Sequence, residues 1–227
     1  MSHSPHIRLY DSQGDIQVWV VDGSYVRGHV DKEFTNFGQH YRFPFIPETE
    51  FWLDQGAEDE YPFFIEHLLV EHRLMAQGRS YDDAIAEAGR AERRERRRGG
   101  DLKAATHSGE SLPLGDFCHK YLWKRLDDGL SVWIVHGRLV RSVFDEDFTA
   151  GGHDHVYEFV PRGEVWIDDG LIEVEWPYAL VHELRERYDM AAGEPYRVAH
   201  PRASRLEYLC RRHPDELHGV LSQLGWA

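Results

Sequence analysis

The chain has 227 residues, which is enough for one large domain or two small ones, and its 41% apolar and 13% aromatic residues can build a core. Charged residues make up 29% of it, and the 20 glycines and 10 prolines are too few for a disordered, collagen-like or low-complexity chain. The net charge of −14 disfavours nucleic acid as a partner, because a negative field repels a phosphate backbone.

The first residues and the cysteines point to a cellular compartment. No apolar run reaches the length of about 18 residues that a membrane span needs, and the N-terminus lacks the basic and apolar regions of a signal peptide. Two cysteines, Cys118 and Cys210, are too few for a disulfide framework. The sequence therefore predicts a cytoplasmic protein without a membrane partner.

An internal repeat is the most informative feature. Residues 18–54 match residues 132–168 at 15 of 37 positions without a gap, and after one inserted residue 60–97 match 175–212 at 15 of 38. Chance does not produce this level of identity, so the chain contains two copies of one unit. The domains we expect are a first repeat at 1–98, a linker at 99–116 and a second repeat at 117–227.

Each copy predicts the same elements in the same order. Alternating apolar residues and Asp/Gly turns favour several antiparallel strands, including short ones at 25–27 and 139–141. Pro62 and Pro177 suit the first turn of a helix, and a second helix follows in each copy. The expected fold class is α+β: a tandem duplication of antiparallel strands followed by a helix pair, with the copies related by a pseudo-two-fold axis.

The second copy contains the segment HELRE, which begins at His182. His182 and Glu186 are four residues apart, so they share one face of a helix, and both side chains are metal ligands. Glu183 stands where a general base could deprotonate a metal-bound water. On the next helix His200 and Glu207 are seven residues apart and also share a face. Two antiparallel helices would bring these side chains together.

Residues 182–207 resemble the HExxH motif of zincin-like metallohydrolases, except that Glu186 stands where that family has its second histidine. The resemblance implies a divalent metal, with zinc preferred and iron or manganese as alternatives. His182, Glu186 and His200 would be ligands, and Glu207 either a fourth ligand or a residue that orients one.

The first copy keeps only part of this set. His67, Glu71 and Glu92 match the second copy, but Leu68 replaces Glu183 and Ile85 replaces His200. In one interpretation the first copy holds a degenerate site and the second copy the functional one. In the other, the shared His-Glu-Glu trio is a buried hydrogen-bonded network that both copies need, with the shared residues Arg90 and Arg205 as partners.

A further histidine pair occurs only in the second copy. His153 and His155 are two residues apart, so on a strand they would point to the same face, whereas the first copy has Gln39 and Tyr41. We expect His153 to be an additional metal ligand. For His155 an exposed position in a glycine-rich turn is an equal alternative.

Together these patterns favour a metal-dependent enzyme, preferably a hydrolase that uses a metal-activated water in the second repeat. The alternative is a non-catalytic acidic interaction or inhibitor protein that binds a basic protein partner.

Overall fold

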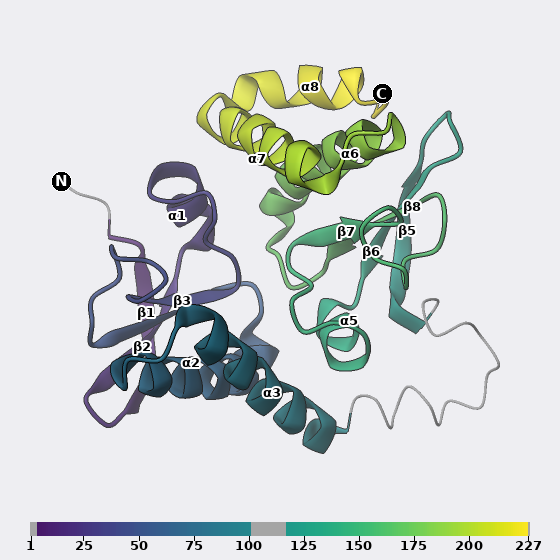
Figure 1. Ribbon diagram of the computed structural model, residues 1–227. Coiled ribbons are helices and arrows are strands. Elements are labelled where there is room, and N and C mark those ends of the chain that lie inside the picture. Colours follow the sequence, from purple (N-terminus) through teal and green to yellow (C-terminus); the bar gives the residue numbers. More distant parts are fainter. Residues whose placement is uncertain (1–3, 101–116, 227) are drawn as a thin grey trace. The chain divides into compact units, whose positions relative to one another are not determined.

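The computed structural model describes residues 4–100 and 117–226. The chain separates into two compact units, Met1–Ser108 and Gly109–Ala227, here called unit 1 and unit 2 (Figure 1). The predicted linker at 99–116 lies, apart from its first two residues, outside the described residues.

Unit 1 is a four-stranded mixed sheet with two long helices after it. The strand order is β1-β2-β4-β3, in which β2 and β4 are parallel and the other neighbours are antiparallel. Its elements are β1 (His6–Gln13), β2 (Ile16–Val21), α1 (Gly23–His29), β3 (Phe37–Gln39), β4 (Glu50–Asp54), η1 (Glu58–Glu60), α2 (Tyr61–Ala76) and α3 (Tyr81–Gly99).

Unit 2 repeats this arrangement and adds a C-terminal helix. The strand order is β5-β6-β8-β7, again with the parallel pair, β6 and β8, in the middle. Its elements are β5 (His119–Arg125), β6 (Ser131–Val135), α5 (Gly137–Val143), β7 (Gly151–His153), β8 (Glu164–Asp168), η3 (Glu173–Glu175), α6 (Trp176–Ala191), α7 (Tyr196–Arg212), η4 (Pro214–Glu216) and α8 (Leu217–Gln223).

The α+β class and the two similar units are as the sequence predicted, with two differences in detail. The central strand pair of each sheet is parallel rather than antiparallel. Residues 25–27 and 139–141 belong to the short helices α1 and α5 instead of strands. Asp22 caps α1, because its carboxylate accepts a hydrogen bond from the Tyr25 amide at 3.0 Å. The pseudo-two-fold relation between the units stays a prediction.

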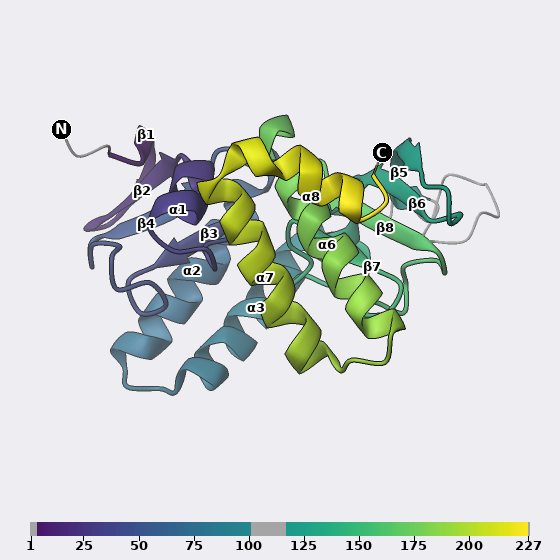
Figure 2. The ribbon, with the colours of Figure 1, turned by 90° about the horizontal axis from the view of Figure 1, so that it is seen from above.

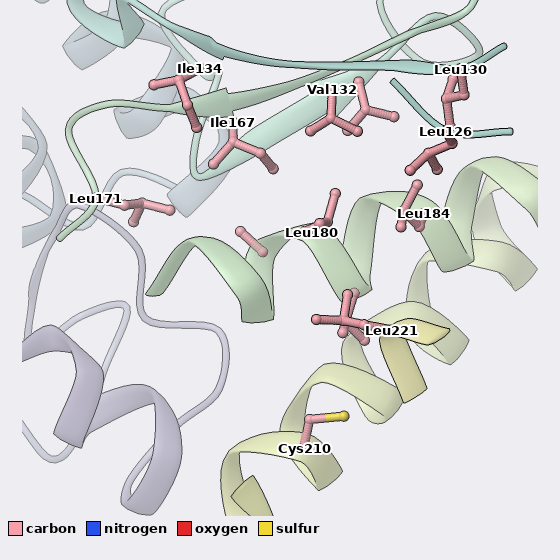
Figure 3. Close-up of a cluster of buried hydrophobic side chains, with 13 residues drawn as sticks. Leu126, Leu130, Val132, Ile134, Ile167, Leu171, Leu180, Leu184, Cys210 and Leu221 are labelled. Carbon is pink, nitrogen blue, oxygen red and sulfur yellow. The ribbon is translucent and has the colours of Figure 1, made fainter. Parts of the chain in front are cut away.

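Helix α6 carries the motif and packs on the sheet of unit 2. Leu180 and Leu184 are one turn apart, fully buried, and point from α6 toward Val132 and Ile167 on the strands (Figure 3). Successive helix residues are separated by about 100°, so Glu183 lies at the border of this apolar face, followed around the helix by positions 186 and 182. The motif therefore runs from the sheet side of α6 toward its other neighbour, α7.

Helices α6 and α7 form a helical hairpin, as α2 and α3 do in unit 1 (Figure 2). Ala199 and Ala203 of α7 are fully buried, and their small side chains allow α7 to approach α6 closely. None of the described helices combines the length and the apolar character that crossing a membrane requires.

Candidate metal centre

Both units contain the same buried ion-pair network within the helix pair. In unit 1, Arg96 is 1% exposed and contacts Glu60 at 2.7 Å and Glu92 at 2.8 Å, and His67 Nδ1 lies 2.8 Å from Glu92. The corresponding chain in unit 2 is Glu175, Arg211, Glu207 and His182. Because it occurs in both units, this network belongs to the fold; of the shared trio it contains His67 and Glu92 but not Glu71.

The cation of the network is not the arginine that the sequence suggested. Arg96 and Arg211 lie one helical turn after Glu92 and Glu207, which places acid and base on the same face. Arg90 instead pairs with Glu87 at the surface.

Among the described residues, three ligand atoms meet beside this network in unit 2 and not in unit 1. His182 Nε2 lies 3.1 Å from Glu186 Oε2 and 3.2 Å from His200 Nδ1, and His200 Nδ1 lies 3.3 Å from Glu186 Oε2. Ligand atoms bound to zinc at ~2.0–2.1 Å in a tetrahedron are about 3.3–3.4 Å apart. The three atoms are therefore spaced almost like one face of a tetrahedral metal site.

The position of His200 leaves this group open on one side. His182 and Glu186 are 13% and 4% exposed in their side chains, whereas the side chain of His200 is 36% exposed and stacks on Tyr196 at 5.0 Å between ring centroids. Catalytic zinc sites commonly use two histidines and one glutamate and keep a fourth position for water or substrate. The donor set and its exposure fit that pattern.

Glu207 lies on the opposite edge of the His182 ring. Its Oε2 is 3.0 Å from His182 Nδ1, and its Oε1 accepts hydrogen bonds from Arg211 at 2.8 and 3.0 Å. A carboxylate on the second ring nitrogen fixes the tautomer and the orientation of a metal-binding histidine. Of the two roles that the sequence left open, the geometry fits the residue that orients a ligand.

Unit 1 lacks the third ligand. His67 Nε2 lies 3.6 Å from Glu71 Oε2, and Ile85 occupies the position of His200. Among the residues that the structure describes, no group of three potential ligands forms in unit 1.

A second group in unit 2 shares Glu186. Ligand atoms of His153, Glu183 and Glu186 lie within 4.8 Å of one another, and all three residues are buried. His153 Nε2 and Glu186 Oε1 have no hydrogen-bond partner among the described residues. In unit 1 the equivalent atoms are bonded, because Gln39 Nε2 donates to Glu71 Oε1 at 2.8 Å.

Gly151 makes room for Glu183, a role that the sequence motifs did not predict. A Cβ atom at Gly151 would lie 2.7 Å from the backbone oxygen of Trp166 and 3.0 Å from Cγ of Glu183. Unit 1 has Phe37 at this position, and its ring packs against Phe64 at 4.7 Å. The exchange of Phe37 and Leu68 for a glycine and a glutamate was visible in the aligned copies and could have drawn attention to Gly151.

His155 does not join either group. Strand β7 ends at His153, so the two histidines do not lie on one strand face, and His155 is exposed in the following turn. The alternative of an exposed turn residue describes it correctly.

The hydrogen bond between His182 and Glu186 shifts their pKa values in opposite directions. Burial opposes charge on His182, but hydrogen bonds to Glu186 and Glu207 outweigh it and raise its pKa to about 10. Burial also opposes charge on Glu186, yet hydrogen bonds from His182 and His200 lower its pKa to about 2. The protonated His182 ring therefore bridges the carboxylates of Glu186 and Glu207, and a divalent cation beside Nε2 would replace its proton toward Glu186.

For Glu183 and His153, burial is the largest cause of the pKa shift. It raises the pKa of Glu183 to about 8 and lowers the pKa of His153 to about 4. Both side chains are therefore largely uncharged near neutral pH, because burial disfavours the charged form of each.

Comparison of the chain with protein-family models, with curated proteins and with solved structures found no match. Fold and site together define an α+β protein of two similar units. Its second unit carries histidine and glutamate groups that could hold a metal ion.

A histidine pair in unit 1 stands where unit 2 has an ion pair. In unit 2, Arg187 donates to Asp154 at 2.7 Å, and the hydrogen bond from Arg187 lowers the Asp154 pKa although burial opposes it. Unit 1 has His72 and His40 at these positions, with ring centroids 5.4 Å apart. Burial and then His40 lower the pKa of His72 below its usual value.

We therefore expect the His40 and His72 pair to make unit 1 less stable as the pH falls below about 6.5. A histidine whose pKa is lowered by folding stabilises fully above about pH 6.5 and loses this contribution as the pH falls toward its folded value, whereas an aspartate with a lowered pKa keeps its contribution down to about pH 4. Hydrogen exchange of unit 1 across this range measures the loss. A variant with His40→Asp and His72→Arg should lose less stability in unit 1 than the parent does, and equal losses in parent and variant would contradict the expectation.

Proposed function

We propose that unit 2 binds a divalent metal ion, preferably zinc, through His182, Glu186 and His200 and catalyses a hydrolytic reaction with it. The observation that supports this is the triangle of three ligand atoms with sides of 3.1, 3.2 and 3.3 Å. Two imidazole nitrogens and one carboxylate oxygen also accept iron or manganese. Unit 1 provides the internal comparison, because it shares two of the three side chains and lacks the third.

The residues around the triangle suit hydrolysis. A bound metal ion would supply a Lewis acid and activate water. Glu183 is the candidate general base, since its carboxyl group lies in the group that shares Glu186 with the triangle. A metal ion bound there would lower its raised pKa and favour the carboxylate form that accepts a proton. Glu207 and Arg211 hold His182 in the tautomer that presents Nε2 to the ion.

Elemental analysis and a turnover assay test the proposal on untagged protein. We expect about one metal ion per chain and chelator-sensitive cleavage within a panel of chromogenic carboxylic esters, phosphate esters and anilides. Glu183→Gln should keep the metal and lower turnover by ~10²–10⁴-fold, because an amide cannot accept the proton. The exposed change Glu173→Gln is the control and should alter neither.

Two results would contradict the proposal. A parent protein without bound metal would rule out the metal site. Full activity in Glu183→Gln would rule out Glu183 as the general base. Absence of metal combined with tight binding to a cationic protein would support the acidic interaction protein instead.

A further inference from the structure

The hydrogen bonds of His153 determine which ring nitrogen carries its proton. The backbone N–H of His155 donates to His153 Nδ1 at 3.2 Å, so Nδ1 holds a lone pair and the neutral ring carries its proton on Nε2. Gln39 has the same arrangement in unit 1, because its Oε1 accepts a hydrogen bond from the Tyr41 amide at 3.4 Å. The two ring nitrogens of His153 thus correspond to the oxygen and the nitrogen of the Gln39 amide.

The acceptor for this proton is also present. Gln39 donates to Oε1 of Glu71, and the corresponding atom in unit 2 is Oε1 of Glu186. Both His153 Nε2 and Glu186 Oε1 are buried, neither has a partner among the described residues, and the two side chains belong to one compact group. A buried donor or acceptor that has no hydrogen-bond partner destabilises the folded protein.

Coordination of a metal by His153 conflicts with this hydrogen bonding. Nε2 could bind an ion only if its proton moved to Nδ1. Two N–H groups, from Nδ1 and from the His155 amide, would then face each other across 3.2 Å. His182 has no such conflict, because a proton on its Nδ1 can be donated to the Glu207 carboxylate.

We propose that His153 is a positioning residue of the metal centre: in the metal-bound protein its Nε2–H donates to Glu186 Oε1, an atom without another partner among the described residues, and leaves only Oε2 to bind the ion. This inference rests on the proposed function and replaces the expectation that His153 is itself a ligand. A carboxylate that is held through one oxygen binds a metal through the other. Released from that hydrogen bond, Glu186 can bind through both oxygens and change the coordination number.

Two substitutions in the full-length protein separate donor from ligand. His153→Gln introduces the residue of unit 1, which donates in the same way, whereas His153→Ala removes the donor. Zinc affinity is measured by competition with a chromophoric chelator, and geometry from the visible spectrum of the cobalt-loaded protein. We expect His153→Gln to match the parent in both and His153→Ala to lose ~10–100-fold in affinity, with the weaker absorption of a higher coordination number.

Gln39→Ala is the matched control in unit 1. It removes the equivalent hydrogen bond to Glu71 and should lower stability without changing zinc affinity. If His153→Gln loses as much zinc affinity as His153→Ala, or binds fewer ions than the parent, His153 is a ligand and the inference is wrong, although the proposed function stands. A parent that binds neither zinc nor cobalt overturns both. If His153→Ala fails to fold, the comparison of His153→Gln with the parent decides alone.

Discussion

Changing His200 to isoleucine, the residue that unit 1 has at this position, will abolish stoichiometric metal binding. The change leaves His182 Nε2 and Glu186 Oε2, 3.1 Å apart, and two ligand atoms do not hold an ion in competition with water. The loss should exceed the ~10–100-fold that follows removal of an outer partner. Elemental analysis after dialysis against buffer without metal measures it.

His200 is a sharper target than His182. His182 also belongs to the buried network with Glu207 and Arg211, so its removal strands buried charges and destabilises unit 2 by about 3–5 kcal/mol. The His200 ring is more exposed and lies outside that network, so His200→Ile should fold normally. The control is His218→Ile, which changes an exposed histidine on α8 and should keep the metal. Metal retained at full occupancy by His200→Ile would place the ion elsewhere.

Long helices were predictable because their pattern repeats over several turns and recurs in both copies. Helix α1 was not, because seven residues give too few turns for a periodicity, and an Asp-Gly pair before an apolar segment is equally typical of a hairpin. The parallel pairing of β2 with β4 was also missed. Pairing direction depends on how the intervening chain crosses the sheet, which no local sequence feature encodes.

The candidate site was likewise predictable where it depends on helical spacing and was not predictable where it depends on the folded backbone. Helical spacing predicted that His182 and Glu186 share a face, and the helical hairpin brought His200 to them. The proton position of His153 depends on the backbone amide two residues later, and the room for Glu183 depends on an adjacent glycine. The proton position of His153 is a property of the folded backbone at an edge strand, so residue types and spacing could not supply it, whereas the room for Glu183 was visible as a paired exchange of residues between the two copies.

Installing a histidine at position 85 of unit 1 should create a second metal site. Unit 1 already has His67 and Glu71 one helical turn apart, with Glu92 on the far nitrogen of His67 and Gln39 on Oε1 of Glu71. Ile85→His supplies the third ligand at the position of His200. We expect the zinc content to rise from about one to about two ions per chain, which elemental analysis measures.

The new site should be weaker than the original one and should not hydrolyse anything. His67 Nε2 and Glu71 Oε2 are 3.6 Å apart, rather than the 3.1 Å of unit 2, so binding must first draw the two side chains together. Leu68 stands where a general base would be needed, so turnover should stay at the parental level.

Ile85→Gln is the control: it introduces a polar side chain without an imidazole and should add no ion. In the double variant Ile85→His and His200→Ile, about one ion should remain while hydrolysis disappears, because the metal has moved to the unit without the base. A folded Ile85→His variant that binds no additional metal would show that three such side chains are insufficient, and that the buried His153, Glu183 and Glu186 group contributes to holding the ion in unit 2.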